Sequence, residues 1–167
     1  MQHPLFPLAV TLRRVPLESR WVDEKWEVAS VTPAAAQADI TREQQGVDTW
    51  FWRGFVLDLH PSEAEGYYLN ISAPDPRVFV MWRLEEWDGG VTARPWVTTI
   101  SYHEAARMMD AGETVDSVPM PQSVREWLMP WLEVNYKPEP RRKHRRNQTF
   151  WREEGAPADG AAPADKA

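Results

Sequence analysis

Apolar and polar residues alternate along much of the chain before residue 100, which is the pattern of β-strands that bury one face. The strongest such segment is residues 50–60, where every second side chain from Phe55 to Leu59 is apolar and aromatic residues are frequent. Gly54 within it marks a bulge or a close approach of another backbone. The predicted strands are residues 8–15, 26–31, 50–60, 66–72, 77–85 and 96–99. We expect five or six short, mostly antiparallel strands that form a curved sheet or a small barrel.

Turn and capping residues place a first helix after these strands. Asp88-Gly89-Gly90 indicates a turn after the strand of residues 77–85. Ser101 and Glu104 form a capping box that begins a helix of about ten residues. Gly112 ends that helix, because glycine readily adopts the left-handed conformation common at helix C-termini.

A second helix is predicted over residues 122–134, with Pro121 at its first position. Pro130 lacks an N–H group and should kink this helix. The segment 110–121 between the two helices could form either a strand or a binding loop. The predicted fold class is therefore α+β, with two C-terminal helices packed on one face or end of the strands.

Charge divides the chain into an acidic body and a basic tail. Residues 1–136 carry 11 Lys and Arg against 20 Asp and Glu, a net charge of −9. Residues 137–152 carry seven against one, or +6, and residues 153–167 carry one against four, or −3. We predict one globular domain, residues 1–137, and a disordered tail, residues 138–167, that is first basic and then rich in Ala and Pro.

The basic run and the aromatic residues that follow it are the strongest candidate contacts with a partner. Aromatic side chains in a polar tail usually have a partner surface, and clustered cations dock on acidic surfaces or phosphates. The predicted partner-binding residues are Arg141, Arg142, Lys143, Arg145, Arg146, Phe150 and Trp151. A protein partner is favoured over nucleic acid, because the acidic body would repel a polyanion.

No residue pattern indicates catalysis, a cofactor or a metal site. The absence of Cys excludes disulfides, thiolate metal sites and cysteine nucleophiles. The four His lack metal-binding spacing, and the chain has no glycine-rich nucleotide loop and no nucleophile-elbow serine. Glu63 with Glu65, and Glu85 with Glu86, could act as acid and base only if burial raised one pKa in each pair. We therefore favour a non-enzymatic protein without a cofactor.

Ten tryptophans in 167 residues must dominate either the core or a contact surface. If some of them line a pocket, the protein binds a small molecule or a cofactor, with or without enzymatic activity, and this is an alternative to the protein-binding function. Its pocket would be lined by Trp50, Trp52, Trp82 or Tyr68, and Arg53 or Arg83 would pair with an anion.

The N-terminal segment does not have the layout of a signal peptide. Two prolines precede a short apolar run, and no cationic stretch comes before it. No apolar run approaches the roughly 18 residues that a membrane helix needs. A cytoplasmic location without membrane contact is expected.

Several motifs occur in the order seen in a known family. They are FPLAVTLRRVPLESRWVDEKWEVASVTP, the strand ending LDLH, EGYYLNISAPDPRVFVMWR and HEAARMMDAGETVDSVPMP. With them the chain resembles domain-of-unknown-function family 3305 over roughly residues 5–146. The resemblance implies a bacterial protein encoded near molybdenum-dependent formate dehydrogenase genes, and hence an accessory or assembly factor for that enzyme. It supplies no catalytic residues. A related label, molybdopterin-guanine-dinucleotide synthesis, would call for a glycine-rich loop that residues 8–17 lack.

Overall fold

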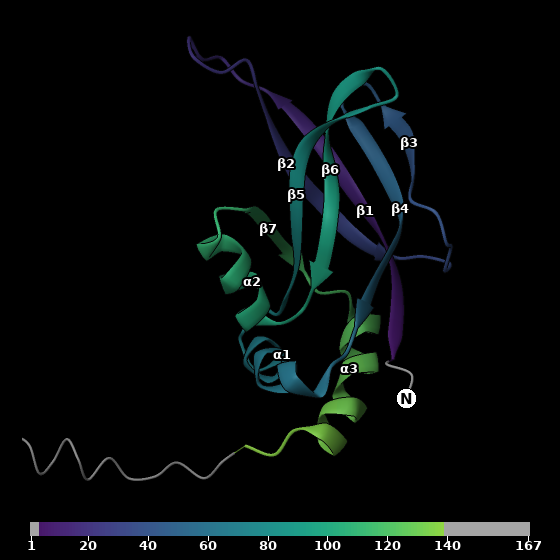
Figure 1. Cartoon of the computed structure of the whole chain (residues 1–167), viewed down its shortest axis with the longest axis vertical. Helices are drawn as coiled ribbons and strands as arrows, with labels where there is room; N and C mark the ends of the chain where they lie inside the picture. The colour runs from purple at the N-terminus through teal and green to yellow at the C-terminus, as the bar shows by residue number, and fades with distance from the viewer. Residues whose placement is uncertain (1–3, 139–167) are drawn as a thin grey trace, which may run out of the picture. The chain divides into compact units, whose positions relative to one another are not determined.

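The computed structural model describes residues 4–138, in which seven strands form two antiparallel sheets accompanied by three α-helices (Figure 1). Mostly antiparallel strands combined with helices were predicted from the alternating pattern, and this is confirmed. Of the predicted tail, only Pro138 falls within the described residues.

The first sheet has four strands in the order β2-β1-β4-β3. They are β1 (Leu5–Pro16), β2 (Glu24–Pro33), β3 (Thr41–Gly46) and β4 (Thr49–Asp58). In β4 the buried residues alternate with less buried ones, apart from the register shift next to Gly54. In β1 Leu8, Val10 and Leu12 follow the same alternation, and Ala9 between them is buried as well. That alternation made β1 and β4 predictable from the sequence.

Gly54 is the extra residue of a bulge in β4, as predicted. Leu8 of β1 pairs with Phe55, but the next residue, Ala9, pairs with Arg53. Gly54 has a φ of +102°, and a Cβ added to it would lie 2.6 Å from the carbonyl oxygen of Asp39. Only glycine satisfies both constraints without strain.

The second sheet has three strands in the order β6-β5-β7. They are β5 (Arg77–Trp87), β6 (Gly90–Thr99) and β7 (Thr114–Pro119). Asp88 and Gly89 join β5 to β6 with φ values of 54° and 87°, which is the pair of positive values that a type I′ hairpin turn requires. The turn predicted at Asp88–Gly90 is therefore confirmed.

The helices are α1 (Ala64–Ile71), which follows the 3-10 turn η1 (Pro61–Glu63), then α2 (Tyr102–Asp110) and α3 (Gln122–Asn135). The Ser101 hydroxyl accepts the N–H of Glu104 at 3.1 Å, and Gly112 ends α2 with a φ of 87°, so the predicted start and stop of this helix are confirmed. Pro121 is the N-cap of α3 rather than its first residue, and Pro130 lies inside the helix.

The predicted count of elements and the curved sheet or small barrel are wrong. The described residues form two sheets that do not close, and three helices rather than two. Residues 66–72, predicted as a strand from their aromatic and branched residues, form most of α1. Ala64, Tyr67 and Ile71 are buried at helical spacing, so packing overrides strand propensity here.

Two further strands are β3, which the sequence did not predict, and β7, which it gave as one alternative. β3 was missed because its sequence, TREQQG, is polar and largely exposed at a sheet edge, and so gives no alternating signal. Of the two alternatives for segment 110–121, the strand is the one that forms, as β7 along the edge of β5.

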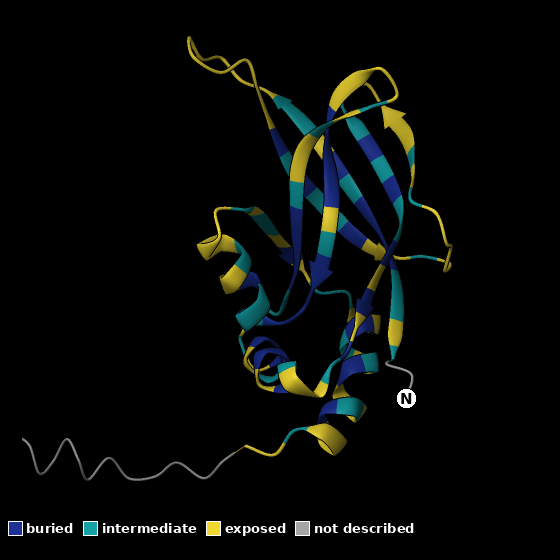
Figure 2. Cartoon of the chain, in the orientation of Figure 1, coloured by how far each residue is buried: buried dark blue, intermediate teal, exposed yellow. Residues whose placement is uncertain are grey.

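Buried side chains from both sheets and the helices form one core (Figure 2). α3 contributes Val124, Leu128 and Leu132, which lie on one face at intervals of four residues. α1 is tied to the second sheet through Asn70, which is fully buried. Its amide donates to the carbonyls of Arg77 and Ile100 at 2.7 and 2.9 Å, and its oxygen accepts the N–H of Arg77 at 2.9 Å.

Asp116 links the two sheets where β2 lies beside β7. Its carboxylate accepts the backbone N–H of Val28 in β2 at 2.9 Å and the indole N–H of Trp82 in β5 at 3.1 Å. One acid thereby satisfies a donor on the edge of the first sheet and a donor in the second.

Asp116→Ala is expected to lower the free energy of unfolding by about 2 kcal/mol or more, because it leaves two partly buried donors without an acceptor. Urea denaturation followed by far-UV circular dichroism measures the change. Asp110→Ala is the matched control, since Asp110 is exposed at the end of α2 and should change the value by less than about 0.5 kcal/mol. Equal stabilities of the two variants would contradict the proposed role of Asp116.

Candidate functional site

The turns of the three β-hairpins lie at one end of the two sheets, and α1 and α3 lie at the other end (Figure 1). We call the residues of these turns and their flanks, 17–25, 46–49 and 84–91, the hairpin end. They belong to the β1–β2, β3–β4 and β5–β6 hairpins respectively. Segments that are far apart in the sequence therefore lie together at the hairpin end.

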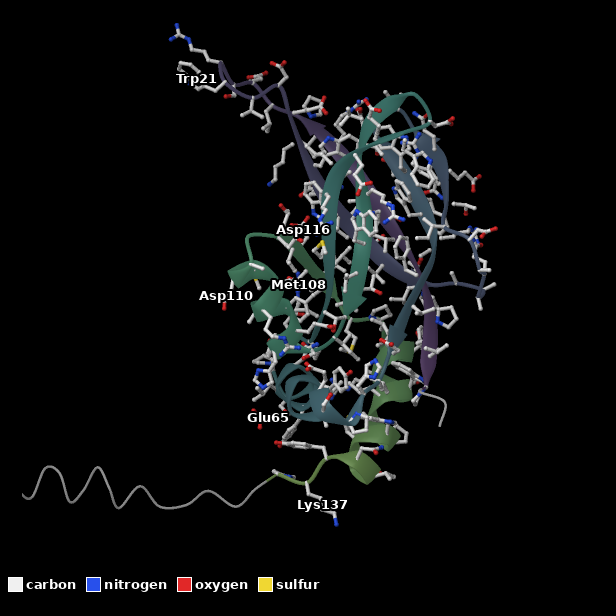
Figure 3. All side chains as sticks on the ribbon, in the orientation of Figure 1. Trp21, Glu65, Met108, Asp110, Asp116 and Lys137 are labelled. Carbon is white, nitrogen blue, oxygen red and sulfur yellow. The ribbon has the colours of Figure 1, made fainter. Side chains whose placement is uncertain are left out.

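The β1–β2 hairpin projects beyond the rest of the hairpin end. All ten residues from 16 to 25 are exposed, and the N–H of Leu17 bonds to the carbonyl of Asp23 at 2.9 Å to close the loop. We call residues 16–25 the arm. Trp21 stands at its tip with 87% of its surface exposed, and Val22 beside it is also exposed (Figure 3).

The other two hairpins also present large apolar side chains to solvent. Val47 is 81% exposed at the β3–β4 turn, and Val91 is 62% exposed beside the β5–β6 turn, with Leu84 exposed on the neighbouring strand. With Leu17, Trp21 and Val22 of the arm, the hairpin end carries six such residues. Single exposed apolar residues are ordinary, but a group of them at one end of a fold is typical of a protein-binding surface.

Stacked tryptophans and arginines lie beneath the hairpin end and connect both sheets. We call this group the Trp–Arg stack. Its members, taken from the β1 side to the β6 side, are Arg14, Trp26, Trp50, Arg42, Trp52, Trp87, Arg94, Trp96 and Arg83. The ring centroids of Trp26 and Trp50 are 5.1 Å apart, and those of Trp52 and Trp87 are 4.8 Å apart. Each such contact stabilises the packing by about 0.5–2 kcal/mol.

The Trp–Arg stack also fixes the turns above it. Arg14 lies over the Trp50 ring at 5.1 Å, and its side chain pairs with Asp48 of the β3–β4 turn at 2.9 Å. At the other end, the Arg94 guanidinium is 3.7 Å from the centroid of Trp96, whose indole N–H donates to Glu85. Residues of the β3–β4 and β5–β6 turns are therefore held by contacts with the Trp–Arg stack.

The pocket predicted from Trp50, Trp52, Trp82, Tyr68, Arg53 and Arg83 does not form around these side chains. Trp50 and Trp52 are buried in the core, and Trp82 is bonded to Asp116. The remaining three pack elsewhere: Tyr68 lies against Tyr136, Arg53 lies over Phe51, and Arg83 pairs with Glu113. Within residues 4–138 the indole N–H of Trp52 has no acceptor, which costs free energy that its ring contacts must exceed.

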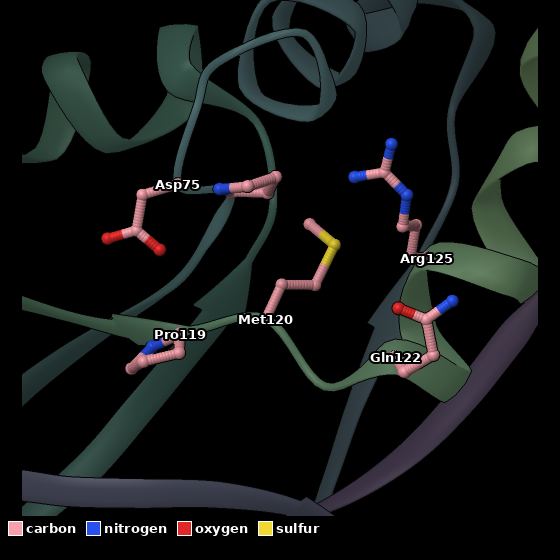
Figure 4. Close-up of a pocket in the computed structure, with 6 residues that line it drawn as sticks. Asp75, Pro119, Met120, Gln122 and Arg125 are labelled. Atoms are coloured by element: carbon pink, nitrogen blue, oxygen red, sulfur yellow. The ribbon is translucent and has the colours of Figure 1, made fainter.

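Two hollows on the described surface are small. One, of about 140 Å³, lies at the start of α3 beside Asp75, Met120 and Arg125 (Figure 4). The other, of about 260 Å³, is a shallow groove between β4 and β6 bordered by Val56 and Trp96. Both are below the roughly 300 Å³ at which small-molecule pockets begin. Neither offers the enclosed site that a cofactor needs.

Glu63 does not have the raised pKa that acid catalysis requires, and the other three candidate carboxylates are bonded to neighbours or exposed. Burial alone would raise the pKa of Glu63, but hydrogen bonds from Ser101 at 2.6 Å and Arg107 at 2.8 Å, together with the Arg107 charge, hold that pKa below its usual range. Glu65 pairs with His103 at 3.0 Å. Glu85 is bonded to Trp96, and Glu86 is exposed.

We call the opposite end of the fold, formed by α1 and α3, the helix end, and it holds a polar network that serves packing (Figure 1). Burial raises the pKa of Tyr67 to about 12, so its hydroxyl stays neutral, accepts the N–H of His60 and donates to the carbonyl of Asp58. Gly66 allows α1 to approach α2, because a Cβ there would lie 2.1 Å from the Ser101 hydroxyl. Among residues 4–138, no group of three or more His, Asp or Glu is arranged to hold a metal ion.

The seven residues predicted to bind a partner, Arg141, Arg142, Lys143, Arg145, Arg146, Phe150 and Trp151, lie outside the described residues. The arm was not predicted as a contact. Its signal in the sequence is an aromatic–aliphatic pair, Trp21-Val22, set in a charged turn between two strands. Within the described part of the chain, no helix is long and apolar enough to cross a membrane.

The model of the family described as protein of unknown function (DUF3305) matches residues 7–145. The chain belongs to this family. The match to DUF3305 covers every strand and helix described above except the start of β1, so the hairpin end and the Trp–Arg stack lie within the DUF3305 region. No curated protein and no solved structure matches the chain.

The lowered pKa of Glu63 predicts a pH-dependent contribution to stability. Its pKa in the folded chain is lower than its ordinary value of 4.5, so ionised Glu63 stabilises the fold above about pH 4.5 and loses this effect as the pH falls through the lowered value. The stability difference between the native chain and Glu63→Gln should therefore be large at pH 7 and shrink towards pH 3. Chemical denaturation at a series of pH values measures it.

Glu126→Gln is the control for this series, because Glu126 is exposed on α3 and forms no ion pair within residues 4–138. It should change stability little at any pH. A Glu63→Gln difference that does not depend on pH would show that the hydrogen bonds from Ser101 and Arg107 do not favour the ionised carboxylate.

Proposed function

We propose that this protein is a non-enzymatic accessory or assembly factor that binds a protein partner in the maturation of a molybdenum-dependent formate dehydrogenase. Binding of a protein partner is supported by the exposed apolar residues of the hairpin end. The link to formate dehydrogenase is supported by the resemblance to the family. The observation that carries the proposal is the arm, which holds an almost fully exposed Trp21 away from the core.

An exposed indole at the end of a hairpin contributes hydrophobic free energy only when a partner buries it. A residue at this position adds nothing to the core, yet it exposes one of the largest apolar surfaces available to a side chain. When a partner buries it, the same side chain becomes an anchor, and tryptophan is among the residues most enriched at such anchors. Truncating an anchor of this kind typically costs about 2 kcal/mol or more of binding free energy, or roughly 30-fold in Kd.

The predicted basic contact at residues 141–151 adds a second attachment point in this proposal. Two contacts on one chain raise the overall affinity above that of either alone when the partner can engage both. Binding of a small molecule is less well supported, because the described hollows are small and the candidate carboxyls are ion-paired or exposed. Binding of nucleic acid through Arg141–Arg146 is less well supported, because the body is acidic.

An affinity pull-down from the native host tests the proposal. Tagged full-length protein should recover formate dehydrogenase subunits or their maturation proteins, identified by quantitative mass spectrometry. Trp21→Ala should reduce the recovery at least tenfold, and a form that ends at Lys137 should also reduce it.

Leu69→Ala is the matched control, since Leu69 is an exposed apolar residue on α1, away from the hairpin end. It should recover the partner as well as the native protein does. Recovery that is unaffected by Trp21→Ala would remove the arm from the proposal, and failure of the full-length protein to recover these proteins would overturn the assignment to formate dehydrogenase.

A further inference from the structure

The apolar side chains of the hairpin end are surrounded by negative charge. Residues 17–25, 46–49 and 84–91 contain seven Asp and Glu against two Lys and Arg, a net charge of −5. Of these acids, only Asp48 takes part in an ion pair within the described residues, with Arg14. Glu85 and Glu24 accept indole N–H groups, of Trp96 and Trp26, which leaves their charge in place.

Four acids of the hairpin end, Glu18, Asp23, Glu86 and Asp88, are exposed and form no ion pair within residues 4–138. Elsewhere in the fold several acids are paired: Glu63 with Arg107, Asp75 with Arg77, and Glu113 with Arg83. The other exposed acids with neither an ion pair nor an indole hydrogen bond within residues 4–138 are spread over the rest of the fold: Asp39, Glu43, Asp110, Glu126 and Glu133. The hairpin end thus holds four of nine such acids in only 21 residues, so unpaired negative charge is densest where the apolar residues are exposed.

We infer that the hairpin end docks onto a basic protein surface, where Trp21 and Val22 enter an apolar pocket ringed by Lys and Arg side chains of the partner. This inference rests on the proposed function and names the chemistry of the partner. Apolar burial supplies the affinity, whereas opposite charges on the rim select the partner and raise the association rate.

The same charge separates this partner from two other classes of macromolecule that bind exposed aromatic residues. Nucleic acids and anionic lipid surfaces both require cationic contacts, and a net charge of −5 repels them. An acidic protein would be repelled in the same way. A basic-rimmed pocket on a protein meets both features of the hairpin end at once.

The experiment uses the full-length chain labelled with 5-fluorotryptophan and observed by fluorine NMR. Trp21→Phe assigns the resonance of Trp21. The probe is an 18-residue amphipathic peptide of Lys and Leu, which presents an apolar face flanked by cations, and the comparison peptide has Gln at every Lys position. The Lys peptide should shift the Trp21 resonance saturably, and the Gln peptide should bind at least tenfold more weakly.

Variants locate the charge effect. Glu18→Gln with Glu86→Gln and Asp88→Asn should weaken binding of the Lys peptide about tenfold or more, and raising the salt from 50 to 500 mM should weaken it further. Asn tolerates the positive φ of residue 88. The matched control, Glu126→Gln with Glu133→Gln on α3, removes charge away from the hairpin end and should leave the affinity within twofold.

Equal binding of the Lys and Gln peptides would overturn the inference, and so would a shift of the Trp21 resonance by phosphatidylserine vesicles. These results are separable from failure of the proposed function. If the Lys peptide does not bind while Trp21→Ala still abolishes recovery of the formate dehydrogenase proteins, the charge selectivity is wrong and the arm remains the contact. If the Lys peptide binds at the hairpin end but those proteins are not recovered, the partner chemistry stands and the process is wrong.

Discussion

The contact between Trp52 and Trp87 is the constraint on which the hairpin end depends. Neither sheet closes on itself, and no backbone ladder joins them within the described residues, so side chains must hold the two layers together. The ring of Trp52, fully buried in β4, meets the edge of Trp87 in β5 at 4.8 Å. On the opposite side of the sheets, the Asp116 carboxylate joins β2 to β5. These two links allow an open pair of sheets to behave as one support.

The chain uses its tryptophans for two different purposes. Five of them belong to the Trp–Arg stack, and their rings pack in contacts between strands. Trp21 makes no such contact with the residues that the structure describes, and it lies at the tip of a hairpin whose strands are held by that stack, through Arg14 and Trp26. Packing energy inside the fold thus keeps the exposed aromatic residue in a defined place, which lowers the entropy cost of presenting it to a partner. The helix end, in contrast, satisfies its polar groups internally.

Features that depend on local chemistry were predictable from the sequence. The bulge at Gly54, the Ser101 cap at the start of α2 and the turn at Asp88–Gly90 each follow from the conformations and hydrogen bonds that particular residues permit. Features that depend on distant partners were not. Residues 66–71 are helical because Gly66 and Asn70 fit against Ser101 and the ends of β5 and β6. The sequence of the segment itself does not indicate these contacts.

The arm could not be predicted from the sequence for the same reason, because its exposure depends on how distant residues pack. Its residues differ little from those of an ordinary charged turn, and only the extension of the β1–β2 pairing to Pro16 and Glu24 shows that Trp21 is carried away from the core. The sequence predicted partner contacts instead at the basic residues from Arg141 onward, because their composition differs from the rest of the chain. Composition identifies unusual segments, whereas the exposure of a single side chain is decided by tertiary structure.

In our proposal the hairpin end, and not the helix end, is the surface that meets a partner. Site-specific photocrosslinking in the native host can decide between the two ends, with p-benzoylphenylalanine placed at position 21 in one strain and at position 69 of α1 in another. We expect ultraviolet-dependent adducts of defined mass from position 21 and none from position 69. Adducts from position 69 alone, or from neither position, would contradict the proposal.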